Sequence, residues 1–294
     1  RAINSFRPTH VHLGSSLVYS YVALALARSR VPLVYRMGDC PPLDSPFNFR
    51  IWNMAMRRCD WIVANSKFVL KSAIAAGVAS TNISVIHNLA PSTTDRVHPT
   101  DPLPDQGDLE NLIYVGAISE HKGLLPLVEA FARLAPEYPS LRLDILGGSR
   151  YDTPFRNQLV QMVAAGGLGS RVFFHGHVAD PSTFLKRTAI HVAPAMWEEP
   201  FANVVLEAKR EGTPSVVFPS GGLPEMVRHQ VDGYICRSKS TDALVEGLRW
   251  MLADTGRLRR MRVAARADSA ARFGPARFAR EWANVYRPEK GGAP

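Results

Sequence analysis

Hydrophobic positions along the chain follow two alternating patterns. Short runs rich in β-branched residues, such as "VPLVYRM" (31–37) and "DWIVANS" (60–66), are typical of buried parallel strands. Longer segments with apolar residues three or four positions apart, such as 47–59, are typical of the helices between them. This alternation predicts parallel βαβ units and therefore an α/β fold.

The alternation breaks once, which predicts two domains. Residues 96–109 are rich in proline and lack apolar periodicity, so we expect a linker there. We expect a partial first domain over 1–95, a second domain over 110–272, and a terminal helix over 273–294 that crosses back to the first domain. The first domain is expected to lack its opening strands, because doubly wound sheets usually hold more strands than it supplies. The expected strands are 9–13, 31–37, 60–66 and 82–88 before the linker, and 111–118, 141–148, 171–178, 189–194, 214–218 and 233–237 after it.

Composition narrows the class of protein. The chain has 294 residues, of which 46% are hydrophobic, as expected of a soluble globular protein with room for two cores. No apolar run approaches the ~20 residues that span a bilayer. Cys40, Cys59 and Cys236 are far apart, so we expect no disulfide framework or zinc site, and a cytoplasmic location.

The net charge of +9 favours anionic partners: nucleotides, phospholipid head groups or nucleic acid. The arginines of 255–272 are interpreted either as a solvated face or as a peripheral contact with an anionic membrane at its inner face. This basic segment lacks interleaved aromatic residues that could stack on bases, so nucleic acid is not an expected partner. Aromatic residues at helical spacing predict that the last helix buries one face: Phe273, Phe278, Trp282 and Tyr286.

The stretch 197–218 carries the candidate chemistry. Pro200 suits the first turn of a helix and Gly212 the position after its end, so a helix of about ten residues is expected between them. Glu199 then precedes this helix. Glu207 lies on it, one turn beyond Asn203.

Such a helix start suits a nucleotide diphosphate. Free N–H groups at Ala202, Asn203 and Val204 would face the anion, where the helix dipole favours negative charge. The carboxylates of Glu207 and Glu199 would accept hydrogen bonds from ribose and sugar hydroxyls.

Two other loops complete this candidate site. Carboxylates repel phosphate, so a cation is needed, and Lys122 follows the strand glycine Gly116 in "YVGAISEHKG". Gly221 and Gly222 would let the backbone approach a bound sugar or phosphate. In a doubly wound fold, such loops lie at the carboxyl ends of strands, where ligands bind.

The order of these motifs resembles the GT-B-fold, family 4 retaining glycosyltransferases. Glu199 and Glu207 match that family's E-x7-E motif, with Pro200 and Phe201 between them, and "GGLPEMVRHQVDGYI" follows its pattern. The resemblance implies two Rossmann-like domains facing a cleft. It also implies transfer of a sugar, with retention, from a nucleotide diphosphate donor to a hydroxyl acceptor in polysaccharide or glycolipid biosynthesis.

The resemblance also implies residue roles. Lys122 would contact the diphosphate, Glu207 the ribose and Glu199 the donor sugar, while His177 and Val178 would lie near the base. The predicted catalytic residues are Glu199, Lys122 and Asp39. The predicted donor-binding residues are Gly116, Lys122, His177, Val178, Glu199, Phe201, Ala202, Asn203, Val204, Glu207, Gly221 and Gly222.

The chain departs from the family pattern at two places. Ala117 stands where the family usually has an arginine, and Arg36 or another arginine is expected to substitute for it. Asp39 lies where many members have a histidine, and it is interpreted either as an active-site residue or as a turn residue. The resemblance predicts no metal and no cofactor, a nucleotide-sugar donor, and a sugar or lipid-linked acceptor.

The sequence also bears on three other classes of function. An NAD-dependent oxidoreductase would need G-x-G-x-x-G after a first strand, and the sequence has none. A nucleotide-sugar epimerase of the same architecture and a catalytically idle nucleotide-sugar-binding protein stay open. His175 and His177 share a strand face, but the sequence offers no third metal ligand near them, so a structural role is expected.

Overall fold

The structure, a computed structural model, describes residues 5–14, 16–90, 111–148 and 154–286. It divides into two compact units: unit 1 is Arg1–Asn88 with Pro275–Pro294, and unit 2 is Leu89–Gly274. The predicted linker, 96–109, lies outside the described residues. Each unit is built on its own parallel sheet, which confirms the predicted α/β class.

Unit 1 contains a parallel sheet whose described strands lie in chain order, β1-β2-β3-β4. The helix predicted over 47–59 is found at Pro46–Arg58. The strands are β1 (Val11–Leu13), β2 (Leu33–Met37), β3 (Trp61–Ala64) and β4 (Ile83–Val85), and the helices are α2 (Leu17–Ala25), α3 (Pro46–Arg58), α4 (Lys67–Ala75) and, at the end of the chain, α12 (Pro275–Tyr286).

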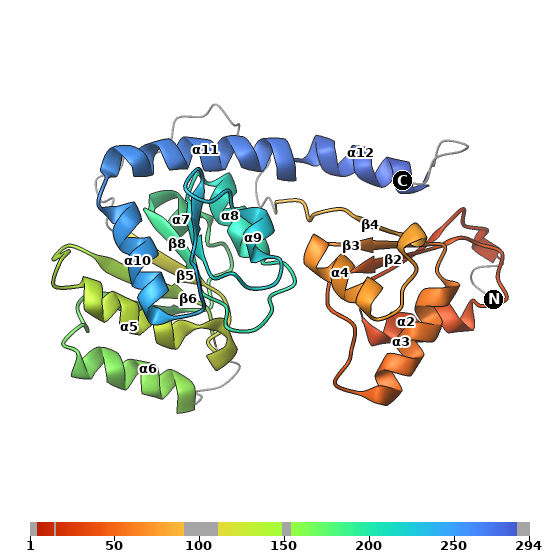
Figure 1. Cartoon of the computed structure of the whole chain (residues 1–294), viewed down its shortest axis with the longest axis horizontal. Helices are drawn as coiled ribbons and strands as arrows, with labels where there is room; N and C mark the ends of the chain where they lie inside the picture. Colours follow the sequence, from red (N-terminus) through yellow and green to blue (C-terminus); the bar gives the residue numbers. More distant parts are fainter. Residues whose placement is uncertain (1–4, 15, 91–110, 149–153, 287–294) are drawn as a thin grey trace. The chain divides into compact units, whose positions relative to one another are not determined.

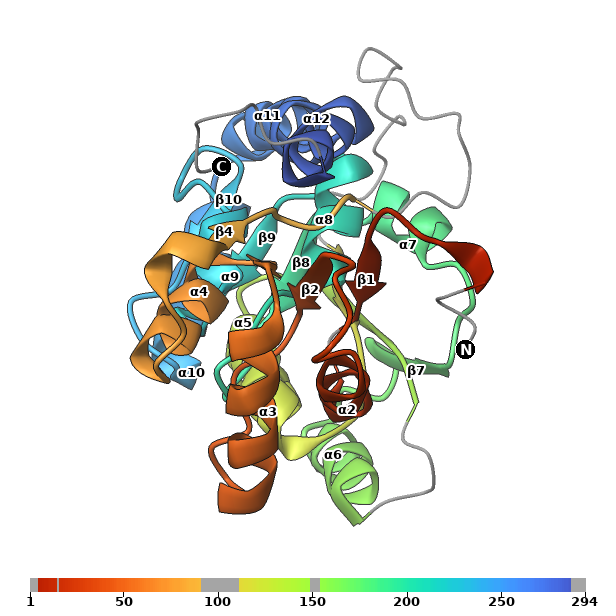
Figure 2. The same ribbon diagram turned by 90° about the vertical axis from the view of Figure 1, so that its right-hand side faces the viewer.

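Side-chain alternation along β2 explains how this sheet is covered. Leu33 and Tyr35 point into a core shared with α2, α3 and α4, and Figure 2 shows α2 and α3 side by side. Val34 points to the opposite face, where it packs with Trp282 and Val285 of α12. The strand is therefore buried on both faces, as its continuous apolar run predicts.

Local capping fixes the ends of these helices. The side chain of Ser16 accepts a hydrogen bond from the N–H of Val18 at the start of α2, as expected for a cap. Ser45 and Ser66 cap α3 and α4 in the same way. Gly77 follows α4 with a φ of +93°, a conformation that glycine adopts without steric cost.

Unit 2 contains a six-stranded parallel sheet, among the described residues, in the order β10-β9-β8-β5-β6-β7. The chain runs outward from β5 to β7, then returns to place β8 on the other side of β5. Ligands of doubly wound folds bind at the carboxyl ends of the strands at such a reversal. The strands are β5 (Asn111–Val115), β6 (Arg142–Leu146), β7 (Val172–Gly176), β8 (Ile190–Ala193), β9 (Ser215–Val217) and β10 (Gly233–Ile235).

Helices cover both faces of this sheet (Figure 1). Leu112 and Tyr114 of β5 pack with α5, α6 and α10, whereas Ile113 between them packs with α7 and α8. The helices are α5 (Leu124–Leu134), α6 (Pro154–Ala165), α7 (Ser182–Arg187), α8 (Asn203–Arg210), α9 (Leu223–Met226), α10 (Thr241–Leu252) and α11 (Thr255–Phe273). No helix in these described ranges is long and apolar enough to cross a bilayer.

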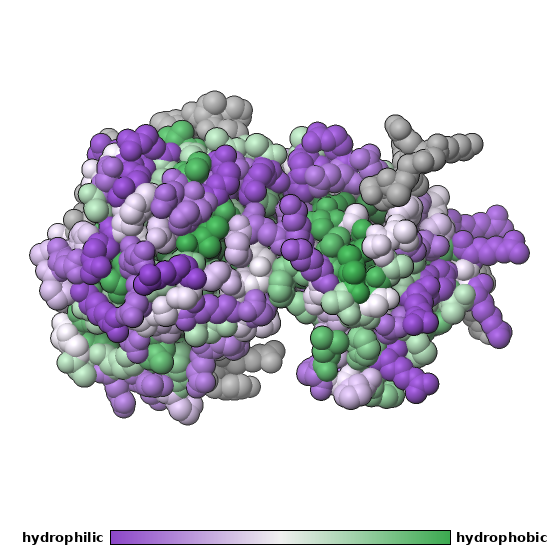
Figure 3. Space-filling view, viewed as in Figure 1, coloured by the Kyte–Doolittle hydropathy of each residue, from purple (hydrophilic) through white to green (hydrophobic). Residues whose placement is uncertain are grey.

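The arginine-rich helix α11 differs from the predicted solvated face. Arg262 is 1% exposed and donates to the backbone oxygens of Thr188 and Lys186, and burial lowers the pKa of its guanidinium to about 10. Arg266, 6% exposed, donates to the backbone oxygen of Glu211. Arg259 and Arg260 are exposed to solvent, as predicted. Figure 3 shows hydrophilic residues along α11.

The predicted aromatic face of the last helix is divided between the two units. Phe273 ends α11 and is buried in a core cluster of unit 2. Phe278, Trp282 and Tyr286 belong to α12 and pack in unit 1. Their helical spacing reflects two successive helices, separated at Gly274, and not one continuous helix.

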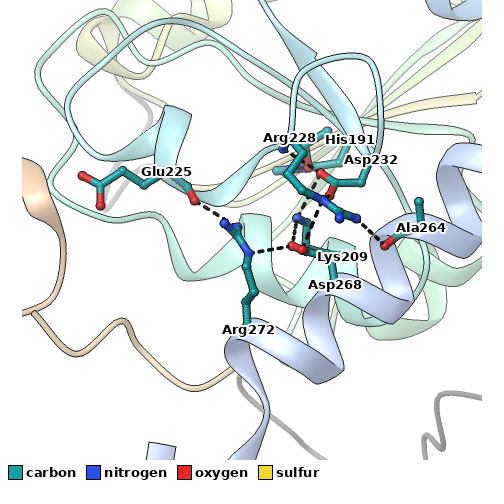
Figure 4. Close-up of polar contacts among 9 residues, drawn as sticks. His191, Lys209, Glu225, Arg228, Asp232, Ala264, Asp268 and Arg272 are labelled. Carbon is teal, nitrogen blue, oxygen red and sulfur yellow. Dashed lines mark hydrogen bonds and ion pairs between the residues drawn. The ribbon is translucent and has the colours of Figure 1, made fainter. Parts of the chain in front are cut away.

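A buried ion cluster joins α8 to α11 (Figure 4). The Lys209 ammonium, 2% exposed, lies 2.5 Å from Asp268 Oδ2 and 3.0 Å from Asp232 Oδ1. Arg228 Nε contacts Asp232 Oδ2 at 2.6 Å, and Arg272 Nε contacts Asp268 Oδ2 at 3.1 Å. The cluster compensates each buried charge with opposite charges, which is the condition for burying an ion at tolerable cost.

We predict that Lys209→Met lowers the free energy of unfolding by about 3 kcal/mol, because it leaves two buried carboxylates with one fewer cation. Urea denaturation measures this loss. The control is Arg133→Met, which removes an ion pair with Asp242 whose side chains are 53% and 75% exposed. This control should cost less than about 1 kcal/mol. Equal losses in the two variants would contradict the structural role of the cluster.

Candidate functional site

The loops after β5 and β8 leave the sheet at its reversal point, on the same edge. The β5 loop passes through Gly116 into a short 3₁₀ helix, Glu120–Lys122, and the β8 loop runs through Glu199 to α8. A cavity of about 430 Å³ lies between these loops. It is lined by Tyr114, Val115, Gly116, Ala117, Lys122, Ala193, Ala195, Glu199, Phe201, Ala202, Asn203, Val204, Glu207 and Leu223.

Glu199 and Lys122 form the charged centre of this cavity. Lys122 Nζ donates to Glu199 Oε2 at 2.6 Å, and the indole N–H of Trp197 donates to the same oxygen at 2.9 Å. Lys122 Nζ also lies 5.0 Å from the centroid of the Trp197 ring, within cation–π range. Because both bonds use Oε2, Glu199 Oε1 is the oxygen available to a ligand hydroxyl.

The start of α8 forms another part of the cavity wall. The helix begins at Asn203 and has eight residues, so the expectation that Pro200 occupies its first turn is wrong. Phe201 is 7% exposed, buried with Val205 and Leu206, and this packing holds the segment before Asn203 out of helical geometry. The predicted helix end is confirmed, since Gly212 follows it with a φ of +76°.

Anions are favoured at this helix start. Ala202 is the residue before the first helical turn, and its methyl group offers no acceptor to the helix N–H groups. Asn203 and Val204 line the cavity, where the helix dipole places partial positive charge.

Glu207 lies one turn into α8 and lines two cavities. One is the main cavity, and the other has a volume of about 100 Å³ and is also lined by Asp180, Ser182 and Arg210. Burial raises the pKa of Glu207, Arg210 acts in the opposite direction, and the negative charge of Asp180 raises the pKa further. Glu207 therefore takes up a proton more readily than an ordinary glutamate.

Close backbone contacts hold the loops of the site together. Gly123 has a φ of +76°, and a Cβ there would lie 1.7 Å from the backbone oxygen of Pro194 in the β8 loop. A Cβ at Gly147, after β6, would lie 1.8 Å from the backbone oxygen of Gly116. The N–H of Met196 donates to the backbone oxygen of His121 at 2.9 Å. These contacts fix the distance between the loops that carry Lys122 and Glu199.

Gly221 and Gly222, predicted to approach the ligand, pack against the backbone of Glu199. The N–H of Gly222 donates to the backbone oxygen of Glu199 at 2.8 Å. Gly221 has a φ of +53°, and a Cβ there would lie 2.2 Å from that same oxygen. The two glycines thus hold the backbone of Glu199. They are not among the described residues that line the cavity, and their predicted contact with the donor stays a prediction.

His177 and Val178 also lie outside the described wall of the main cavity. His177 is exposed on the loop after β7, whereas Val178 packs in an apolar cluster with Leu185 and Ala208. The neighbouring His175 donates through Nε2 to Asp144 Oδ1 at 2.6 Å, consistent with a structural role. Among the described residues, no group of three or more His, Cys, Asp or Glu side chains could hold a metal ion.

Asp39 and Arg36 belong to unit 1, whereas the described cavity is formed by residues of unit 2. Asp39 is exposed after β2. Arg36 Nη2 donates to Asn88 Oδ1 at 2.6 Å, so it is engaged within its own unit. The predicted catalytic role of Asp39 stays a prediction.

Trp197 and Tyr114 belong to the site but are not among the residues predicted from the sequence. Trp197 stands two positions before Glu199, and an aromatic residue so close to a predicted site residue is a signal that could have placed it in the site. Tyr114 has the pattern of a core residue of its strand, yet it lines the cavity, and its hydroxyl donates to the backbone oxygen of Ala117 at 2.7 Å. Burial, and then the charge of Glu199, raise the pKa of Tyr114, which keeps this hydroxyl protonated.

Comparison with known proteins identifies the class of protein. The family model described as "Glycosyl transferases group 1" matches residues 101–268, and the one described as "Glycosyltransferase Family 4" matches residues 1–90. The chain therefore belongs to the group 1 glycosyltransferases.

Relatives and solved structures agree with this membership. The chain is 30% identical over 184 residues to an uncharacterized glycosyltransferase of Methanocaldococcus jannaschii, covering 62% of this chain and 46% of the relative. It is 27% identical over 206 residues to a lipopolysaccharide 1,2-N-acetylglucosaminetransferase of Salmonella typhimurium, covering 67% and 54%. The chain thus spans about half the length of these curated relatives.

Solved structures show the same fold. The Anabaena protein HepE in complex with UDP matches with a TM-score of 0.82 and 24% identity, over 93% of this chain and 78% of that chain. A glycosyltransferase from Rickettsia africae matches with a TM-score of 0.83 and 17% identity, over 97% and 78%. These matches confirm the predicted GT-B fold of two Rossmann-like units.

We predict that Gly123→Ala disrupts the site, because the new Cβ would meet the Pro194 oxygen and the αL conformation disfavours alanine. The expected loss in the free energy of unfolding exceeds about 2 kcal/mol. Gly169→Ala is the matched control, since a Cβ there has nothing within 4 Å. This control should change stability by less than about 0.5 kcal/mol. Thermal and urea unfolding of both variants measure the difference, and a tolerated Gly123→Ala would refute the close approach.

Proposed function

We propose that unit 2 binds a nucleoside-diphosphate sugar and that the protein transfers the sugar to a hydroxyl acceptor with retention at the anomeric carbon. The observation that carries this proposal is the shared cavity of Lys122, Glu199 and the start of α8, at the reversal of the sheet. Membership of a glycosyltransferase family supports it. The HepE structure contains UDP, which supports a uridine nucleotide as the first donor to try.

The charges of the cavity match the parts of such a donor. Lys122 and the N–H groups at the start of α8 are positive and suit the diphosphate. Glu199 Oε1 and the carboxylate of Glu207 are acceptors and suit the hydroxyls of the sugar and the ribose. Lys122 is the one Lys or Arg among the described residues that line the main cavity. The diphosphate therefore depends on it more than on any other side chain.

The proposed reaction places negative charge on the departing diphosphate. The bond between the anomeric carbon and the diphosphate oxygen breaks while the acceptor oxygen attacks the same face of the sugar. The proton of the acceptor hydroxyl passes to the departing phosphate oxygen. Lys122 and the α8 dipole stabilise the negative charge on the leaving group, and groups already in place cost no reorganisation during the reaction.

We propose a cellular role in the synthesis of surface polysaccharide or glycolipid. One relative is named as a lipopolysaccharide transferase, which supports polysaccharide or glycolipid biosynthesis with a sugar or lipid-linked acceptor. A net charge of +9 and exposed arginines on α11 support a peripheral contact with the inner face of an anionic membrane. The donor site as described needs no metal ion, because Lys122 and α8 supply its positive charge.

The first test is donor binding by isothermal titration with UDP, GDP, ADP and their glucose conjugates. We predict that Lys122→Met weakens binding of the preferred nucleotide at least about tenfold, since it removes the cation of the cavity. Ala117→Arg adds a cation to the cavity wall and should tighten binding. Arg142→Met controls for net charge, because Arg142 lies at the opposite end of its strand, and it should leave affinity unchanged. Absence of binding to all six compounds would refute the proposal.

Product analysis tests the chemistry. Incubation with the bound nucleotide sugar and an acceptor should give a product with retained configuration by NMR, and an inverted product would contradict retention. A change of sugar configuration without an acceptor would indicate the epimerase. Binding without turnover of either kind would indicate an idle binding protein.

A pH dependence follows from Glu207. Its carboxylate is the form that accepts two ribose hydroxyls, so nucleotide affinity is full above its raised pKa and falls as the pH drops through it. We predict that Glu207→Gln weakens binding about tenfold at neutral pH. The ratio of wild-type to variant affinity, measured between about pH 4 and pH 8, should fall towards acid. The ratio cancels the protonation of the phosphate itself. A ratio that does not change with pH would contradict this role of Glu207.

A further inference from the structure

The loop 219–222 holds the backbone of Glu199 through hydrogen bonds. The N–H of Glu199 faces Ser220 Oγ at 3.4 Å, and the hydroxyl of Ser220 donates to the backbone oxygen of Trp197. The N–H of Gly222 donates to the backbone oxygen of Glu199 at 2.8 Å. The position of the Glu199 carboxylate in the cavity therefore depends on how firmly this loop is fixed.

An ion pair beside Glu199 fixes that loop. One carboxylate oxygen of Glu198 accepts the N–H of Gly221 at 2.7 Å, and the other accepts the ammonium of Lys239 at 2.5 Å. Lys239 Nζ also donates to the backbone oxygen of Met196 at 3.1 Å. We name these two residues the Glu198–Lys239 clamp. The clamp joins three chain segments: the β8 loop, the loop 219–222, and the loop between β10 and α10.

The clamp is not a ligand contact by its position. Among the described residues that line the main cavity, neither Glu198 nor Lys239 is present. The two carboxylate oxygens of Glu198 are engaged instead by the N–H of Gly221 and the ammonium of Lys239.

Nor does the clamp have the properties of a stabilising ion pair. The Glu198 side chain is 56% exposed and that of Lys239 is 23% exposed. The hydrogen bond from Lys239, and then that from the Gly221 N–H, lower the pKa of Glu198, so this carboxyl group is ionised at neutral pH. Exposed pairs contribute about 0–1 kcal/mol to stability. A purely structural role therefore predicts almost no effect of its removal.

We propose that Glu198 and Lys239 are positioning residues that set the Glu199 carboxylate against the hydroxyls of the donor sugar. This inference rests on the proposed function. Its physical basis is that a displacement of about 1 Å at a binding group costs much affinity and rate, even where the fold is unchanged. Glu199 Oε1 faces the sugar, whereas the diphosphate and ribose also rest on the start of α8 and on Glu207, so the clamp should affect binding of the sugar more than binding of the nucleotide.

The test compares two ligands in each variant by isothermal titration: UDP and UDP-glucose, or the GDP or ADP pair if the wild type prefers it. We expect Glu198→Ala and Lys239→Met to weaken binding of the nucleotide sugar about five- to tenfold. Binding of the nucleoside diphosphate should weaken much less than binding of the nucleotide sugar. Lys239→Arg keeps a cation that can reach Glu198, so it should retain most of the wild-type affinity for the nucleotide sugar.

The matched control removes another exposed ion pair of unit 2. Arg249 Nη2 lies 2.7 Å from Glu137 Oε1, with side chains 46% and 43% exposed, and joins α10 to the segment after α5. Arg249→Met should leave both affinities unchanged. The melting temperatures of the control and the clamp variants should agree closely.

Each other outcome overturns the inference. Unchanged affinity for the nucleotide sugar in Glu198→Ala means that the clamp does not position Glu199. An equal loss for both ligands means that the variants disturb the fold of the site as a whole. A wild type that binds none of the three nucleotide pairs overturns the proposed function, and the role of the clamp with it. The wild-type titration thus separates failure of the function from failure of the clamp.

Discussion

The ion pair between Lys122 and Glu199 is the contact on which the site depends. The two residues are 77 positions apart in the sequence, and they meet because the sheet of unit 2 reverses between β5 and β8. Their side chains are 26% and 10% exposed, so each charge is partly removed from water and needs the other. The order of the strands therefore brings the charges of Lys122 and Glu199 into one cavity. These charges, together with the start of α8, determine which ligands the cavity can bind.

Backbone packing gives this pair its precision. Gly123 and Gly221 have positive φ values of +76° and +53°. Each lies so close to a backbone oxygen of the β8 loop that a Cβ atom at that position would clash with it. The loop that carries Glu199 is thus held from both sides by main chain. Main-chain contacts have few alternative conformations, so they locate a side chain better than flexible side chains do.

The basic character of the chain has two physical uses. Lys209, Arg262 and Arg266 are buried, and they compensate carboxylates or backbone oxygens inside unit 2. Exposed arginines and Lys122 supply positive charge to solvent and to the cavity. The net charge of +9 therefore overstates the charge that an anionic partner meets, because part of it is paired in the interior.

Local patterns were sufficient for most of the strands and helices along the chain and for the spacing of Glu199 and Glu207. Strand alternation, the Ser16 cap and the Gly212 helix end depend on neighbours in the sequence, so the chain itself determines them. The start of α8, the burial of Arg262 and the partners of Glu199 were decided by the tertiary structure. Phe201 lies outside the helix, buried in a cluster that includes the distant residues Met226 and Phe273. An arginine bonded to backbone oxygens, such as Arg262, has the same sequence signature as an exposed one. Contacts between segments far apart in the chain carry no local pattern, and these contacts set the geometry of the site.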